Sequence, residues 1–262
     1  EYQINDRMSF MRFLGINLCE KVPDAKTIWK FKNDLAETET VDKLFCMFDE
    51  HLENKGLISH KGTIVDATFV DAPRQRNSRD ENKKIKNGVI PEGWEKPENK
   101  SKLAQKDIDA DWTKKNGERH FGYKDHVKCD ADSKLITNYS VTSASVHDSQ
   151  RCLVFIGQED EVLYADSAYS GKPIALALPE NCKNQICEKG YRNSPLTSEQ
   201  KMNNRRKSRI RCRIEQIFGF MTGAMHGITI RSIGITRAWM NIGITNLVYN
   251  FCRYSYLKRA SA

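Results

Sequence analysis

Three carboxylates have settings in which they could do chemistry: Asp66, Asp166 and Glu215. The two aspartates lie within apolar, β-branched or aromatic runs at 62–70 and 162–171, a pattern typical of buried strands. A charge in such a run costs free energy unless it is paired or binds a metal ion. The glutamate lies in a helical, strongly basic stretch. Hard divalent cations take oxygen ligands, so this set matches what a two-metal phosphoryl-transfer site requires.

The surrounding elements must bring these acids together. The expected order allows the first strand and the strand carrying Asp166 to lie side by side, so that Asp66 faces Asp166. The helix carrying Glu215 can then pack across the sheet. Each acid taken alone is equally well explained as a helix cap or a surface charge. The three together, in this order, favour a site.

Composition narrows the class of protein. The chain has 262 residues, a net charge of +8 and 29% charged residues, which favours a polyanionic partner. Its eight cysteines are scattered, as expected of reduced thiols in a cytoplasmic protein. No secretory signal is recognisable, and the charge-free stretch at 238–252 is too short to span a bilayer. We therefore expect a cytoplasmic protein without a membrane span.

The periodicity predicts a mixed α/β fold with a small helical unit at 1–57 and a catalytic domain at 58–262. Helix-turn-helix DNA reading by the helical unit is one option, and simple helix packing is the other. A polar insertion at 72–118 follows the first strand and is either functional or disordered. Helices are expected at 7–20, 25–35, 41–55, from 147 to about 157, after 171, 197–219 and 234–257, and strands at 62–70, 120–130, 134–142, around 166 and at 184–188.

A basic run without a single acid leads into Glu215. We favour phosphate contacts for it, although a solvated helix face is the alternative, and an ion pair of Arg211 with Glu215 at i, i+4 would compete. The candidate DNA-binding residues of this run are Arg205, Arg206, Lys207, Arg209, Arg211 and Arg213.

Further candidates keep two interpretations each. Lys124 could bind phosphate or be a surface charge, and His147 could orient the site or begin a helix. Tyr169 could pack over a metal site or fill the core. Trp94 and Trp112 could stack on unpaired bases or anchor the insertion.

Five motifs resemble the DDE transposases of bacterial insertion sequences, and most closely the insertion sequence 5 group within the insertion sequence 4 superfamily. The similarity covers nearly the whole chain. The motifs are Ile64-Val-Asp-Ala-Thr-Phe-Val70, Phe121-Gly-Tyr-Lys124, Val146-His-Asp-Ser149, Ala165-Asp-Ser-Ala-Tyr-Ser-Gly171 and Arg213-Ile-Glu-Gln-Ile-Phe-Gly219.

This resemblance implies a ribonuclease-H-like fold in which Asp66, Asp166 and Glu215 bind two Mg²⁺ ions, with Mn²⁺ as a substitute. It implies cleavage of double-stranded DNA at transposon ends, strand transfer into target DNA and a homodimer on DNA. The superfamily's Tyr-Arg-Glu-Lys signature is incomplete, since Ser208 and Thr222 occupy the Tyr and Lys positions. A nuclease without strand transfer and a non-catalytic DNA-binding derivative stay as alternatives.

Overall fold

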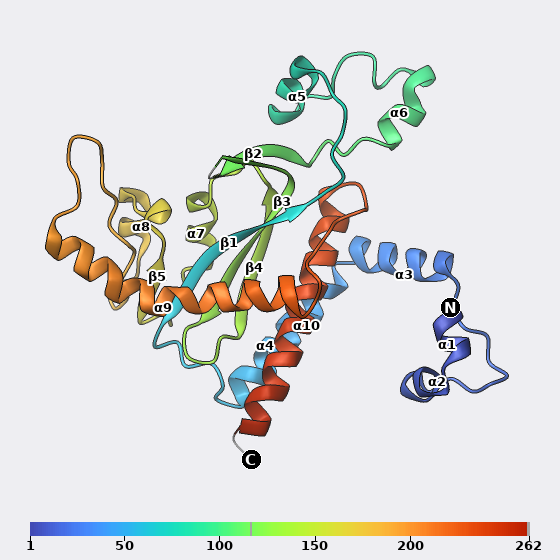
Figure 1. Ribbon diagram of the computed structural model, residues 1–262, viewed down its shortest axis with the longest axis horizontal. Helices are drawn as coiled ribbons and strands as arrows, with labels where there is room; N and C mark the ends of the chain where they lie inside the picture. The colour runs from blue at the N-terminus through green and yellow to red at the C-terminus, as the bar shows by residue number, and fades with distance from the viewer. Residues whose placement is uncertain (116, 261–262) are drawn as a thin grey trace.

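A six-stranded mixed sheet forms the centre of the molecule (Figure 1). The computed structural model describes residues 1–115 and 117–260. β1 (Thr63–Asp71) pairs antiparallel with β3 (Glu118–Asp130) and parallel with β5 (Val162–Ala165). The first part of β3 pairs with β2 (Asp111–Lys115) and the rest with β4 (Ile136–Ser143), while β6 (Lys183–Asn184) extends the sheet beyond β5. The predicted mixed α/β architecture is confirmed.

Helices cover both faces of the sheet because successive strand residues point to opposite sides. Ile64 of β1 joins the core formed with α9 (Ser198–Gly223) and α10 (Ile235–Ala260). Its neighbour Val65 joins a second core with α7 (Ser149–Phe155) and α8 (Lys172–Ala177). Both residues are almost fully buried. This two-sided burial fixes the register of β1 and hence the side on which each of its polar residues emerges.

The N-terminal helices divide into a packed pair and a projecting pair (Figure 1). α3 (Ala25–Glu37) begins at the predicted N-cap Asp24, which accepts a hydrogen bond from the Thr27 amide, and α4 (Thr40–Asn54) follows it. Both pack against α10. The helix predicted at 7–20 is shorter: α1 (Tyr2–Asp6) precedes α2 (Met8–Leu14), which ends where Gly15 adopts a left-handed conformation. The domain boundary at residue 57 stays a prediction.

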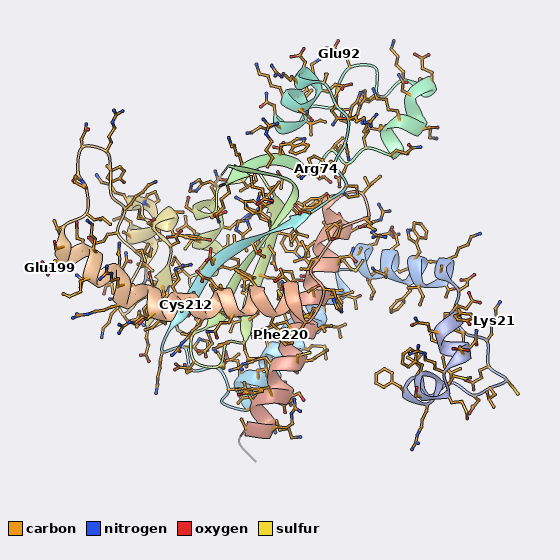
Figure 2. The ribbon with its side chains drawn as sticks, in the orientation of Figure 1. Lys21, Arg74, Glu92, Glu199, Cys212 and Phe220 are labelled. Carbon is orange, nitrogen blue, oxygen red and sulfur yellow. The ribbon has the colours of Figure 1, made fainter. Side chains whose placement is uncertain are left out.

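The segment predicted as a polar insertion contains regular elements in its described part, 72–115 and 117–118, and partly belongs to the sheet. It contains α5 (Arg79–Lys86), the 3₁₀ turn η1 (Pro97–Asn99), α6 (Lys100–Ala104) and β2. Arg74 marks where the chain leaves β1 for this insertion (Figure 2). Trp94 is buried and donates a 2.9 Å hydrogen bond to Glu81, so it anchors the insertion and is not free to stack on bases. Within this segment, β2 is an edge strand of the sheet.

The last helices begin close to where the sequence places them. Thr197 accepts from the Gln200 amide, and the Gln200 side chain accepts from the Thr197 amide, so a capping box starts α9. The stretch at 226–233 makes one parallel bridge, from Thr229 to Asp71 of β1. α10 then runs across the sheet and contacts β4, α3 and α4. These contacts hold α9 and α10 in fixed positions over the strands.

Candidate active site

Asp66 and Glu215 meet at one guanidinium group. Arg211 donates to Oδ2 of Asp66 at 3.0 Å through Nη1 and to Oε1 of Glu215 at 2.6 Å through Nη2. The Asp66 side chain is mostly buried and also accepts a 2.8 Å hydrogen bond from the Ala67 amide, whereas that of Glu215 is half exposed. A helix-borne acid and a strand-borne acid, distant in sequence, are therefore placed together by the packing of α9 on β1.

Asp166 lies at the same level of the sheet. β1 and β5 are parallel neighbours with Val65 opposite Ala165, so Asp66 and Asp166 are the residues that directly follow this last pair. Asp166 is exposed and caps the 3₁₀ turn η2 (Ser167–Tyr169), accepting a 2.6 Å hydrogen bond from the Ser167 amide. The expectation that Asp166 lies inside a buried strand was wrong, because β5 ends one residue before it.

The electrostatics agree with this clustering. Burial raises the pKa of Asp66, and the nearby charge of Asp166 raises it further, while the Ala67 amide, Arg211 and Lys115 lower it. Tyr169 is almost fully buried, and its hydroxyl has no hydrogen-bond partner in the described chain. Burial raises the pKa of that phenol, with smaller contributions from Asp66, Asp148 and Asp166. Tyr169 itself packs in the core that contains Val65 and Ala165, the residues just before Asp66 and Asp166.

These residues fit a site for hard cations. Their carboxylates supply only oxygen donors, and the Arg211 guanidinium between two of them shows that the place attracts positive charge. By donor distances alone, the one group in the described residues that already has metal-ligand spacing is His60, Glu159 and Asp160.

That second group already has a cation. Lys128 places its ammonium 2.9 Å from Oδ2 of Asp160 and 3.6 Å from Oε1 of Glu159, and His60 pairs with Glu53 at 2.7 Å. Asp160 also accepts hydrogen bonds from the Thr63 hydroxyl and the Gly157 amide. We interpret it as an ion network that fastens the ends of β1, β3 and β5.

Comparison with known families decides the class of protein. Residues 58–251 match the transposase DDE domain family. The chain belongs to this family. Residues 1–34 separately match a transposase domain family, DUF772. The chain has no match among solved structures.

Family membership makes this chain a DDE transposase, a DNA-processing enzyme that depends on divalent metal ions. It agrees with the predicted enzyme class and with a DNA substrate. Among the helices that the structure describes, none has the length and apolar character needed to cross a bilayer.

Two of the predicted DNA-binding residues lie near the acids but are engaged within the transposase. Lys124, on β3, donates to Oδ1 of Asp148 at 2.7 Å and to the Val146 carbonyl at 2.6 Å, and its side chain is almost buried. His147 shares a 2.8 Å hydrogen bond with the Ser149 hydroxyl at the start of α7. Phosphate binding by either residue stays a prediction.

The basic run on α9 separates into two sets. Arg205, Arg206 and Arg209 are exposed and form no ion pair with a described carboxylate. The other members hold the helix in place: Lys207 donates to the Ile186 carbonyl at 2.9 Å, and Arg213 donates to the Ala131 carbonyl at 2.6 Å and to Asp132 at 3.1 Å. The exposed arginines are therefore the members most available to DNA.

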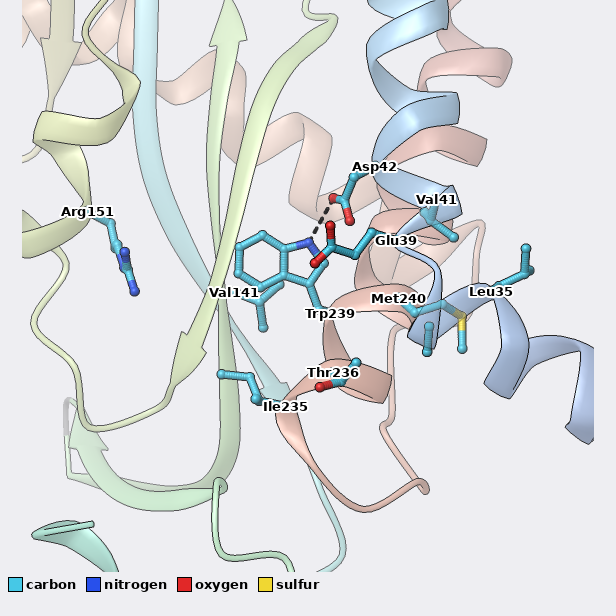
Figure 3. A pocket seen from close by; sticks show the side chains of 11 residues that line it. Leu35, Glu39, Val41, Asp42, Val141, Arg151, Ile235, Thr236, Trp239 and Met240 are labelled. Carbon is cyan, nitrogen blue, oxygen red and sulfur yellow. Dashed lines mark hydrogen bonds between the residues drawn. The ribbon is translucent and has the colours of Figure 1, made fainter.

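A pocket of about 470 Å³ lies between α4, α10 and β4, in a different part of the transposase (Figure 3). Asp42 and Trp239 in its lining pair with each other, since Asp42 accepts from Trp239 at 2.8 Å and also from the Tyr139 hydroxyl at 2.6 Å. None of the three site acids lines it. It is a packing space between helices rather than part of the reactive centre.

Proposed function

We propose that Asp66, Asp166 and Glu215 are the catalytic carboxylates of this transposase and that they bind two Mg²⁺ ions, with Mn²⁺ able to substitute. The observation that carries this proposal is the convergence of Asp66 and Glu215 on Arg211, with Asp166 directly after the end of the neighbouring strand β5. When bound, such ions activate the attacking oxygen and stabilise the leaving one.

The residues of the chain have separate roles in this proposal. The Ala67 and Ser167 amides orient the carboxylates of Asp66 and Asp166. The packing of Tyr169 in the core next to the residues that precede the two aspartates excludes water from one side of the site. Arg211 lies within contact of Asp66 and Glu215, so it must release at least one of them when metal ions take its place.

The substrate in this proposal is double-stranded DNA, first at the transposon ends and then at the target. Water cleaves the phosphodiester bond at an end, and the freed 3′-hydroxyl attacks a target phosphodiester. No covalent bond to the protein forms. Because two ends must be held, we propose that the transposase binds DNA as a homodimer. We also propose that it belongs to the insertion sequence 5 group and acts in the bacterial cytoplasm. The exposed arginines at 205, 206 and 209 bind phosphates.

The test is cleavage of transposon-end DNA and supercoiled plasmid with Mg²⁺ or Mn²⁺. Asp66→Asn and Glu215→Gln are expected to abolish nicking while leaving DNA binding intact, because each removes a metal-binding carboxylate and keeps the side-chain shape. Glu199→Gln, at an exposed acid in the first turn of the same helix, is the matched control and should cleave like the wild type. Metal-dependent cleavage that survives in Asp66→Asn would refute the site assignment.

A second assay separates the alternatives. Pre-cut transposon ends and a plasmid target are supplied together, and joined products are counted. Joining is expected of a transposase. Cleavage without joining would leave a nuclease, and DNA binding without either activity would leave a non-catalytic derivative.

A further inference from the structure

A basic groove of about 620 Å³ lies between the insertion and the edge of the sheet. We call it the α5–β2 groove. Arg79 and Lys86 of α5 form one wall, and Lys114 of β2 and Arg119 of β3 form the other. No carboxylate is among the described residues that line it. None of the four cations forms an ion pair with any carboxylate in the parts of the chain at 1–115 and 117–260.

The pairing of β2 with β3 places two of these cations directly across from each other. Lys114 is the register partner of Arg119, and both side chains are exposed. Like charges in directly opposed positions destabilise a strand pair. A fold that retains this repulsion, with two further cations on the facing helix, is arranged to receive an anion.

Uncharged polar groups complete the lining. Gln75, Asn77 and Asn82 line the groove, with Asn77 donating a 3.3 Å hydrogen bond to Asn82. The amide nitrogens of such side chains donate to phosphate oxygens and to base edges, whereas their oxygens only accept. Trp112 also lines the groove, with the Arg74 guanidinium 5.8 Å from its ring centre. An extended ligand with several anionic groups matches this lining better than a single small anion.

Two cations of the α5–β2 groove lie on the face of the sheet that carries Asp66. Val127 is the register partner of Asp66, and every second residue of β3 from Val127 leads back to Arg119, the partner of Lys114. Lys115, the residue after Lys114, lies 5.6 Å from the Phe69 ring centre and is close enough to lower the pKa of Asp66. Lys124 approaches the same ring at 5.3 Å. Ser145 lines the groove and is followed by Val146, whose carbonyl binds Lys124. Lys115, Phe69 and Lys124 lie on the opposite face of the sheet, so basic side chains flank both sides of this edge.

We propose that the α5–β2 groove binds the sugar–phosphate backbone of the DNA strand that passes the catalytic acids. This inference rests on the proposed function, and it gives the insertion a role in binding DNA. α5, anchored by Trp94 and Glu81, supplies one wall of a DNA path whose other wall is the sheet edge. The strand comes from the transposon end or from the target, since both have the same phosphate chemistry.

The experiment measures DNA affinity by fluorescence anisotropy over a range of salt concentrations, with the full chain. The probes are a short duplex of arbitrary sequence and a duplex carrying the terminal repeat of the element that encodes this chain. The groove variant is Lys86→Gln/Lys114→Gln. The matched control is Lys96→Gln/Lys100→Gln, which removes two exposed lysines of the same insertion that lie outside the groove.

The groove variant is expected to reduce the slope of log Kd against log salt by about two and to weaken binding about tenfold or more near 0.1 M salt. The control pair should keep the wild-type slope, and Lys86→Arg/Lys114→Arg should restore it. Equal loss on both duplexes assigns the groove to backbone contacts shared with target DNA. Loss confined to the terminal-repeat duplex assigns it to the transposon end.

The experiment distinguishes failure of the groove proposal from failure of the proposed function. If the groove variant binds both duplexes with the slope of the control while metal-dependent nicking still vanishes in Glu215→Gln, the groove proposal is overturned and the proposed function stands. If the wild type binds neither duplex, both are overturned. Thermal unfolding of each variant, followed by circular dichroism, verifies that the altered slope comes from a folded protein.

Discussion

Asp125 of β3 offers a test of how the sheet is joined to α10. Its side chain is fully buried and accepts a 3.2 Å hydrogen bond from the Asn246 amide. The second oxygen of Asp125 and the amide oxygen of Asn246 have no partner in the described chain. A proton on the carboxyl supplies the missing donor for such a pair of acceptors. Burial raises the pKa of Asp125 to about 8, with the Asn246 hydrogen bond acting in the opposite direction.

The sign of the pH dependence follows from this pKa. The unfolded chain releases the Asp125 proton near the ordinary value of 3.8, and the folded protein holds it to about 8. The free energy of unfolding therefore decreases as pH rises through this window. A difference of about four pKa units corresponds to an upper limit on the order of 5 kcal/mol. Asp125→Asn removes the titration and keeps a side chain that can pair with Asn246.

Urea unfolding, followed by circular dichroism at a series of pH values between about 5 and 9, measures the effect. Asp125→Asn is expected to become progressively more stable than the wild type as pH rises. The difference between the two profiles is decisive, because Asp49, whose pKa burial raises to about 7, contributes a decline of the same sign to both. Asp6→Asn, at an exposed acid, is the control. Parallel profiles for Asp125→Asn and wild type would refute the reasoning.

Three stability predictions follow from packing and capping, each measured by the same urea unfolding at neutral pH. Ile217→Ala, at a fully buried position of α9, should cost about 2–5 kcal/mol, and a loss below 1 kcal/mol would contradict the packing described. Gly243→Ala should cost about 1–3 kcal/mol, since the new methyl would contact the Tyr139 hydroxyl and lie 2.9 Å from Val41. Thr197→Ala should cost about 1 kcal/mol through the lost cap, whereas Thr197→Ser should be nearly neutral.

The sequence predicts most strands because their burial leaves a pattern. β1 has apolar residues on both faces and β3 has them on one face, which identifies both strands and makes Asp66 conspicuous. β2 escapes prediction because an edge strand with Trp112, Thr113 and two lysines lacks such a pattern. Its place is decided by pairing with β3, the strand that follows it in the chain.

The site likewise contains one contact that the sequence indicates and another that only the fold determines. The intrahelical ion pair of Arg211 with Glu215 was an open alternative from spacing alone, and the structure contains it. The second contact, from Arg211 to Asp66, depends on how α9 crosses β1. Local sequence carries no signal for that crossing. The exposure of Asp166 likewise depends on where pairing with β1 stops.

The position of Arg211 also bears on whether the protein folds before or after it binds metal ions and DNA. Three neighbouring carboxylates would repel one another in a newly made chain, and one of them is mostly buried. An arginine that already bridges two of them supplies a built-in counter-ion. The chain can therefore complete its fold before it meets a metal ion or DNA, so treatment with a chelator should silence the enzyme without unfolding it.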